Sequence, residues 1–128
     1  MRGISCLRAR VEGLSENIRV RSVLGRYLEH SRIYRFANGR GPGLPTILIG
    51  SADLMPRNLD RRVEALVPVD EPELQARLDE ILEVNLADDT LAWVLDQHGG
   101  WRHVDGERSI DTHLRLQEIA RKRARRLG

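Results

Sequence analysis

The segment Pro45-Thr46-Ile47-Leu48-Ile49-Gly50-Ser51 decides the fold that we expect for this chain. Its residues are apolar on both faces of an extended backbone, which is typical of a central strand that is covered on both sides. A shorter apolar strand, Ile33 to Phe36, precedes it, and a third is expected from Arg62 to Val69. The glycine-rich run 38–43 indicates a turn between the first two strands. These segments predict the sheet of the protein.

Helical spacing of apolar residues predicts the elements that cover this sheet. A first helix is expected from Ser15 to Glu29, because its apolar residues recur every three or four positions. A second helix is expected to begin at a capping box made by Asp70 and Glu73, with Pro72 in its first turn. A basic third helix is expected at about 109–127.

A hairpin is expected between the last two helices, with strands at 91–95 and 101–104. Trp93 and Trp101 are expected to pack across the strands, although stacking on a base is an alternative role. The fold class is therefore α/β (α+β): a mixed sheet covered by helices, with an added hairpin and a C-terminal helix. The 128 residues are expected to form one domain, with a core at about 1–105.

The distribution of charge divides the chain. Residues 1–62 contain 12 Arg and 5 acidic residues, whereas residues 63–120 contain 4 Arg and 14 acidic residues. Residues 121–128 add five basic side chains. The first half is thus expected to face anions. No apolar run is long enough to span a bilayer, and the single Cys6 excludes an internal disulfide and fits a reducing cytoplasm.

The ends of the first two strands carry the polar side chains that suggest a site. His30 lies just before one strand, and the segment Ser51 to Arg62 follows the next. Two short strands would bring these segments to the same edge of the sheet. An imidazole, a hydroxyl, an amide and guanidiniums could then converge there on anionic oxygens. The pattern is typical of a phosphate site. His98, His103 and His113 lack the spacing of a metal site and are expected at the surface.

Three motifs carry a family resemblance. They are GLSENIRV at 13–20, GRYLEHSR at 25–32 and GSADLMPRN at 50–58, and the residues from Arg61 to Glu64 continue the last one. In this order and at these separations they closely resemble the C-terminal domain of bacterial polyphosphate kinase. The likeness extends through Trp93 and Trp101 into the last helix.

The resemblance implies a fold similar to phospholipase D and an ATP:polyphosphate phosphotransferase that transfers the terminal phosphate of ATP reversibly. It implies that Arg2 and His30 bind ATP or phosphate and that His30 is catalytic. Several other residues are expected to contact or support polyphosphate: Arg32, Ser51, Arg57, Asn58, Arg61 and Arg62.

The resemblance also implies partners outside this chain. These are ATP or ADP, polyphosphate, the remaining kinase domains and further copies in a homo-oligomer. Magnesium is implied, with its ligands elsewhere, and so is a phosphohistidine on a preceding domain. The chain alone is therefore expected to be an inactive fragment, cytoplasmic or membrane-associated as part of the full enzyme.

Two other functions fit parts of the sequence. A non-catalytic module could bind polyanions or nucleic acid through the basic first half and the tail from Arg121 to Arg126. A phosphodiesterase of the phospholipase D type could use His30 from two chains. That family has Lys two residues after the histidine and Asp seven residues after it, whereas this chain has Arg32 and Ala37. These differences argue against lipid hydrolysis.

Overall fold

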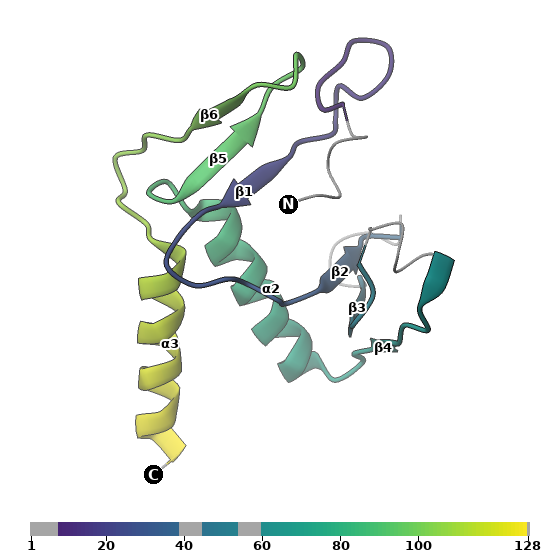
Figure 1. The fold of residues 1–128 in the computed structure, drawn as a ribbon. Helices are drawn as coiled ribbons and strands as arrows, with labels where there is room; N and C mark the ends of the chain where they lie inside the picture. Colours follow the sequence, from purple (N-terminus) through teal and green to yellow (C-terminus); the bar gives the residue numbers. More distant parts are fainter. Residues whose placement is uncertain (1–7, 39–44, 54–59, 128) are drawn as a thin grey trace. The chain divides into compact units, whose positions relative to one another are not determined.

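The computed structural model describes residues 8–38, 45–53 and 60–127 (Figure 1). The chain divides into two compact units, which are described separately: residues 1–6 with 29–79, and residues 7–28 with 80–128. Arg2, Arg57 and Asn58 lie outside the described residues. The strands and helices are β1 (Arg21–Val23), β2 (Ile33–Phe36), β3 (Thr46–Gly50), β4 (Leu66–Pro68), α2 (Pro72–Ala87), β5 (Ala92–Leu95), β6 (Trp101–His103) and α3 (Thr112–Leu127).

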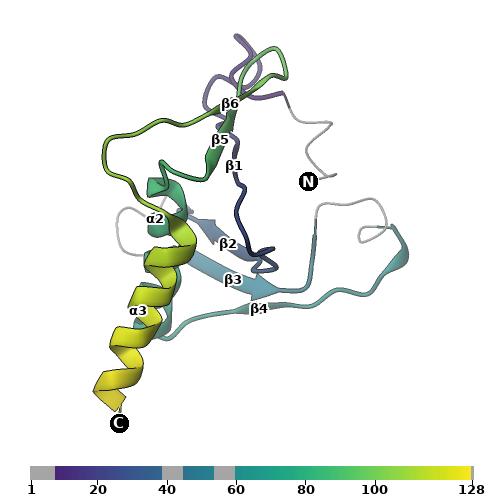
Figure 2. The same ribbon diagram turned by 60° about the vertical axis from the view of Figure 1, so that its left-hand side comes forward.

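The first unit contains a three-stranded antiparallel sheet with β3 between β2 and β4 (Figure 2). Ile47 on β3 is fully buried, which confirms the prediction that this strand is central. Ile33 pairs with Ile49, and Gly50 pairs with Leu66. The strand expected from Arg62 is shorter than predicted, because residues 60–61 are helical and the regular pairing begins only at Leu66.

Helix α2 begins one residue later than the predicted capping box requires. The amide of Gln75 donates to the carbonyl of Glu71 at 2.9 Å, which is the first hydrogen bond of the helix. Glu71, and not Asp70, is therefore the N-cap residue, and Pro72 occupies the first helical position as expected. The side chain of Gln75 also donates to the carbonyl of Val69 at 2.8 Å, which ties the end of β4 to this first turn.

The helix predicted from Ser15 to Glu29 is wrong. Residues 12–17 form turns, and β1 then pairs antiparallel with β5. Val20 and Ser22, two positions apart, are both buried, which is the period of a strand and not of a helix. The β-branched Val20 and Val23 favour the extended backbone, and pairing with β5 completes it. The local pattern fits both structures, and the tertiary partner decides between them.

The predicted hairpin is present, but it belongs to a second sheet. Strands β5 and β6 pair with each other and β5 also pairs with β1, so the second unit has its own antiparallel sheet. Trp93 faces His103 in the register, and their rings meet edge to face with centroids 5.3 Å apart. Trp101 lies opposite Leu95. The mixed α/β class is confirmed, whereas the expected single sheet is replaced by two.

Helix α3 has a well-defined start. Asp111 is its N-cap: the carboxylate accepts from the amide of Leu114 and the carbonyl accepts from the amide of Arg115, each at 2.9 Å. The start lies three residues after the predicted Ser109, which instead has a left-handed backbone with φ of 51°. His113, expected at the surface, is buried against Tyr27.

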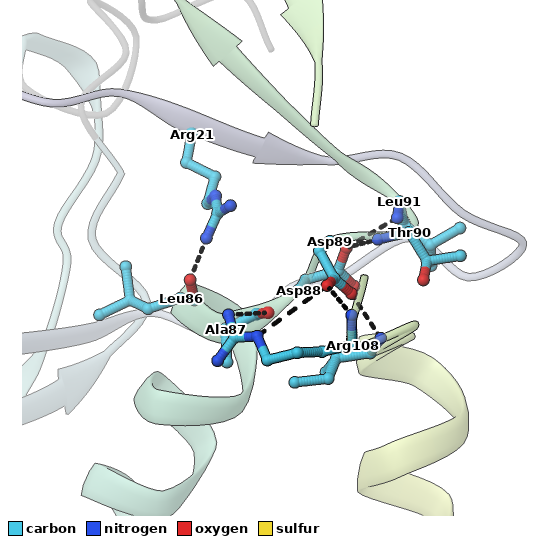
Figure 3. Close-up of polar contacts among 9 residues, drawn as sticks. Arg21, Leu86, Ala87, Asp88, Asp89, Thr90, Leu91 and Arg108 are labelled. Atoms are coloured by element: carbon cyan, nitrogen blue, oxygen red, sulfur yellow. Dashed lines mark hydrogen bonds and ion pairs between the residues drawn. The ribbon is translucent and has the colours of Figure 1, made fainter. Parts of the chain in front are cut away.

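A buried carboxylate joins α2, β5 and α3 (Figure 3). Asp88 is completely buried and accepts hydrogen bonds from the amides of Thr90 at 3.1 Å, Leu91 at 2.7 Å and Thr112 at 2.7 Å. Burial raises the pKa of Asp88, but the hydrogen bonds from Thr112, Leu91 and Thr90 together hold it below its ordinary value. The carboxylate therefore stays ionised and satisfies amides at the start of α3.

Asp89, the next residue, fastens the loop that precedes α3. Its carboxylate accepts from the amides of Arg108 at 3.0 Å and Ile110, and its own amide donates to the carbonyl of Ile110 at 3.1 Å. A Cβ atom at Gly106 would lie 2.2 Å from the Asp89 carboxylate, so only glycine fits there. The two adjacent aspartates thus bind successive amides at 108, 110 and 112, where the connection from the hairpin enters α3.

Two arginines complete the C-terminal end of α2. Arg21 donates to the carbonyl of Leu86, and Arg108 donates to the carbonyl of Ala87 at 3.3 Å (Figure 3). The last carbonyls of a helix have no partners within the helix, and cations are favoured beside them. The two guanidiniums therefore provide hydrogen bonds to the last carbonyls of α2, and their positive charge offsets the negative charge of the two aspartates that follow the helix.

Replacing Asp88 by Asn should destabilise the second unit by about 3 kcal/mol at neutral pH, because the amide nitrogen would face a backbone N–H in either orientation. Since the folded pKa of Asp88 lies below the unfolded value of 3.8, its stabilising effect is present above that pH. The effect is lost as pH falls through the folded pKa. Urea unfolding followed by tryptophan fluorescence at several pH values measures both changes.

The matched control is Glu107→Gln, which converts an exposed carboxylate to an amide in the same unit. It should change the free energy of unfolding by less than about 0.5 kcal/mol. Equal stability of Asp88→Asn and the wild type would contradict the structural role of this carboxylate.

Candidate functional site

The candidate site lies at the edge of the first sheet where the ends of its strands meet. Because β2 and β3 are antiparallel, the start of β2 lies beside the end of β3, and the amide of Gly50 donates to the carbonyl of Arg32 at 3.3 Å. On the other side, the amide of Ser51 donates to the carbonyl of Ala65 at 3.0 Å. The predicted juxtaposition of the His30 segment with the segment after Gly50 is therefore present.

The His30 side chain is exposed at this edge. The backbone carbonyl of His30 accepts a hydrogen bond of 2.7 Å from Nη1 of Arg32, and this bond fixes the main chain at His30. An exposed imidazole can donate to or accept from an anionic oxygen without further rearrangement. The structure thus leaves the ring of His30 accessible while it fixes the backbone that carries it.

Arg32 bridges the two strand ends. Its Nη2 forms an ion pair of 3.3 Å with Asp53 after β3, and both side chains are about one-third exposed, at 30% and 38%. Its Nε is buried and has no hydrogen-bond partner among the described residues. Arg32 was predicted to contact or support polyphosphate, and this role stays a prediction; in the structure its guanidinium bonds to Asp53 and to the carbonyl of His30. Asp53 is the residue of this site that the sequence did not single out.

Ser51 is also bonded within the protein. Its hydroxyl donates to Oε2 of Glu64 at 2.5 Å and accepts from the amide of Ala65 at 3.2 Å. A Cβ atom at Gly50 would lie 2.0 Å from the carbonyl oxygen of Ala65, which explains glycine at the end of β3. The proton of Ser51 is thus directed at a carboxylate, and the residue joins β3 to the chain before β4.

The other residues predicted for the site fall into two groups. Arg61 and Arg62 are exposed in the segment that leads to β4. They lie just before Glu64 and Ala65, the two residues that bond to Ser51. Arg2, Arg57 and Asn58 lie outside the described residues, and so their predicted roles stay predictions. The described part of the edge therefore presents His30, Arg61 and Arg62 to solvent, whereas the side chains of Arg32 and Ser51 are bonded within the protein.

The described residues contain neither a metal-binding cluster nor a helix that could span a membrane. Within 8–38, 45–53 and 60–127 there is no group of three or more His, Cys, Asp or Glu side chains placed to hold a metal ion. In the same ranges, no helix combines the length and apolar character that crossing a membrane requires.

Comparison with known proteins identifies the family. The family model described as polyphosphate kinase C-terminal domain 2 matches residues 1–115. The chain belongs to this family. A polyphosphate kinase from Streptomyces coelicolor is 50% identical over 127 residues, which cover 96% of this chain and 17% of that relative. Polyphosphate kinase 1 from Chlorobaculum tepidum is 54% identical over 101 residues, which cover 79% of this chain and 14% of the relative.

A solved structure gives the same result. The crystal structure of polyphosphate kinase from Porphyromonas gingivalis matches with a TM-score of 0.77 and 33% identity over 85% of this chain and 17% of that chain. The family and the fold of the polyphosphate kinase C-terminal domain are thus shown. The chain spans less than one-fifth of the length of these relatives.

Replacing Asp53 by Asn should loosen the contact between the strand ends. The partly buried guanidinium of Arg32 would then lack its carboxylate partner. The Gly50 amide, which bonds to the Arg32 carbonyl, should exchange with solvent about five-fold faster. This increase corresponds to a loss of roughly 1 kcal/mol in the free energy of local opening. Hydrogen exchange followed by NMR measures this amide directly.

Asp79→Asn is the control for this experiment, because it removes a different ion pair, Arg35 with Asp79 at 2.7 Å, from the same unit. It should leave the exchange of Gly50 unchanged. If both substitutions accelerate Gly50 equally, the effect is general to the unit and Asp53 has no specific role at the site.

Proposed function

We propose that this chain is one domain, residues 1–128, of an ATP:polyphosphate phosphotransferase and that it contributes phosphate-binding groups to the active site. The observation that carries this proposal is the antiparallel edge at which exposed His30 lies beside the end of β3. Membership of the polyphosphate kinase C-terminal domain family supports it. Because the chain is a small part of its relatives, the complete reaction belongs to a longer enzyme.

The proposed role of His30 follows from its chemistry and its exposure. An exposed imidazole can donate a hydrogen bond to a phosphate oxygen or transfer a proton as the phosphoryl group moves. Phosphoryl transfer depends mainly on alignment and on positive charge around the transferring oxygens. Arg61 and Arg62 would add that charge, and Arg2 would bind the phosphates of ATP as the resemblance implies.

Arg32, Ser51 and Asp53 have supporting roles in this proposal. The Arg32 bonds to the His30 carbonyl and to Asp53 hold the imidazole segment against the end of β3. Ser51 fixes the next segment through Glu64 and Ala65. Alignment of the phosphate would thus depend on bonds made before any ligand arrives, which limits the entropy lost on binding.

Magnesium does not fit the described residues of this edge. Its preferred ligands are carboxylate oxygens and water, but Asp53 is paired with Arg32 and Glu64 accepts from Ser51. We therefore assign no step of the reaction to a metal held by this chain. The phosphorylated histidine, the other domains of a phospholipase-D-like enzyme and its further subunits are likewise proposed to lie outside it.

A binding experiment tests this function. Calorimetric titration of the chain with polyphosphate and with magnesium-ATP should give weak binding that Arg2→Ala and His30→Ala each weaken about ten-fold, equivalent to one charge-assisted hydrogen bond. Arg77→Ala, at an exposed position on α2, should change the affinity less than two-fold. Salt should weaken polyphosphate binding in all variants. Binding that is indifferent to Arg2 and His30 would contradict the site.

A non-catalytic polyanion-binding module is the second candidate, because Arg121, Arg125 and Arg126 are exposed at the end of α3. Deletion of residues 121–128 separates the two functions. A module that binds through this tail would lose most of its affinity for polyphosphate, whereas a domain that binds at the His30 edge would keep it.

A further inference from the structure

A pocket of about 230 Å³ lies in the second unit, beside the turn of the β5–β6 hairpin. Val94 and Leu95 line it together with Arg10, His98 and Arg102. Asp96 and Gln97 complete the lining. These residues come from the first turn of the unit and from the hairpin, two segments that are far apart in the sequence.

The two guanidiniums of the pocket are available to a ligand. Arg102 lies opposite Val94 in the β5–β6 register, and directly paired residues project from the same face of a sheet. Among residues 8–38, 45–53 and 60–127, neither Arg10 nor Arg102 forms an ion pair. Arginines that converge on a concave surface without carboxylate partners are suited to bind an oxyanion in bidentate fashion.

Asp96 is the one acidic residue among those that line the pocket, and its carboxylate is hydrogen-bonded to the hairpin turn. Its Oδ1 accepts from the amides of Gly100 at 2.7 Å and His98 at 2.9 Å, and these bonds hold the pKa of Asp96 below its ordinary value. A Cβ atom at Gly100 would lie 2.6 Å from Oδ2 of Asp96. The carboxylate therefore shapes the turn, and the charge it brings is offset by backbone N–H groups.

The backbone holds Arg10 in place. Arg10 has a left-handed conformation with φ of 59°, which costs about 1 kcal/mol for a residue with a Cβ atom. Its amide donates to the carbonyl of Ser15 at 3.0 Å. Buried Ser15 in turn donates to the carbonyl of Arg8 at 2.5 Å and accepts from the amide of Val11 at 3.1 Å. This closed turn fixes the position from which the Arg10 side chain reaches the pocket.

The size of the pocket limits its ligand. Pockets for complete drug-sized ligands begin at about 300 Å³. A volume of about 230 Å³ lies below that range and favours a small ligand of the size of one or two phosphoryl groups. The arginines of the lining and the small volume of the pocket thus both favour a small oxyanion.

We propose that this pocket binds a short phosphate oxyanion through Arg10 and Arg102, either free pyrophosphate or the end of a polyphosphate chain. The proposal goes beyond the function assigned to the His30 edge, because all residues of the pocket belong to the other unit. It requires no covalent step, and it makes the second unit a contributor to ligand binding as well as to stability.

Calorimetric titration of the whole chain with inorganic pyrophosphate tests this site. The wild type should bind one equivalent saturably, and Arg10→Asn and Arg102→Gln should each weaken binding at least five-fold. Asparagine is chosen at position 10 because it tolerates the left-handed conformation. Arg77→Gln makes the same charge change on α2 and should alter affinity less than two-fold. In an amide NMR titration with pyrophosphate, saturable shift changes at Arg10 and Arg102 report on this pocket, whereas shift changes at the His30 edge report on the proposed function, so the two can fail independently.

Competition identifies the source of the phosphate. If long polyphosphate displaces pyrophosphate in proportion to the number of chain ends, the pocket takes the end of the polymer. If it does not displace pyrophosphate, the pocket takes the free ion. Unfolding of each variant, followed by circular dichroism, shows that the fold is retained. Lack of saturable binding, or an equal loss of affinity in Arg77→Gln, would overturn the proposal.

Discussion

Because β3 pairs antiparallel with both of its neighbours, the start of β2, the end of β3 and the chain before β4 must meet at one edge of the first sheet. The candidate site depends on this constraint. It brings together segments that are about twenty residues apart in the sequence without any need for a long-range hydrophobic contact. The side-chain bonds of Arg32 and Ser51 then fasten the three segments where the regular pairing ends.

The second unit is organised by polar groups at helix ends. Among its described residues, the buried apolar ones are Ala9, Val20, Ala92 and Leu95. Asp88 and Asp89 are also buried and are bonded to backbone amides from three segments. Buried carboxylates are tolerated when their hydrogen bonds replace those of water. Asp88 accepts from the amide of Thr112, the first residue of α3, and Asp89 accepts from amides of the loop before it. Arg21 and Arg108 donate to the last carbonyls of α2. Asp88 and the two arginines thus each bond to a helix end of opposite polarity.

The elements that the sequence predicted correctly are those with one dominant local signal. The apolar segment 45–51 had no alternative to a buried strand, and the turn 96–100 fixed the hairpin. The segment 15–29 was misassigned because its apolar spacing suits a helix and only the pairing of β1 with β5 makes it a strand. The shift of the α2 cap from Asp70 to Glu71 is a smaller example, since both acidic residues precede Pro72.

The meeting of the strand ends at one edge was predictable from the sequence, but the side-chain bonds within that edge were not. The order of His30, two strands and Ser51 required only antiparallel pairing, and this was sufficient to predict the edge. The roles of Arg32 and Asp53 were not predictable, because an arginine near a phosphate site can bind ligand or a nearby carboxylate equally well. The pocket between Arg10 and Arg102 was also missed, since it depends on a left-handed turn and on a cross-strand neighbour that no short motif records.

The central claim is that a polyanionic phosphate ligand meets this chain at the open edge of the first sheet. The most direct measurement is an amide NMR titration with polyphosphate at low salt. The largest shift changes should fall on His30, Arg32, Gly50 and Ser51, and His30→Ala should suppress them. Shift changes confined to the basic end of α3, with the edge of β2 and β3 unaffected, would contradict it.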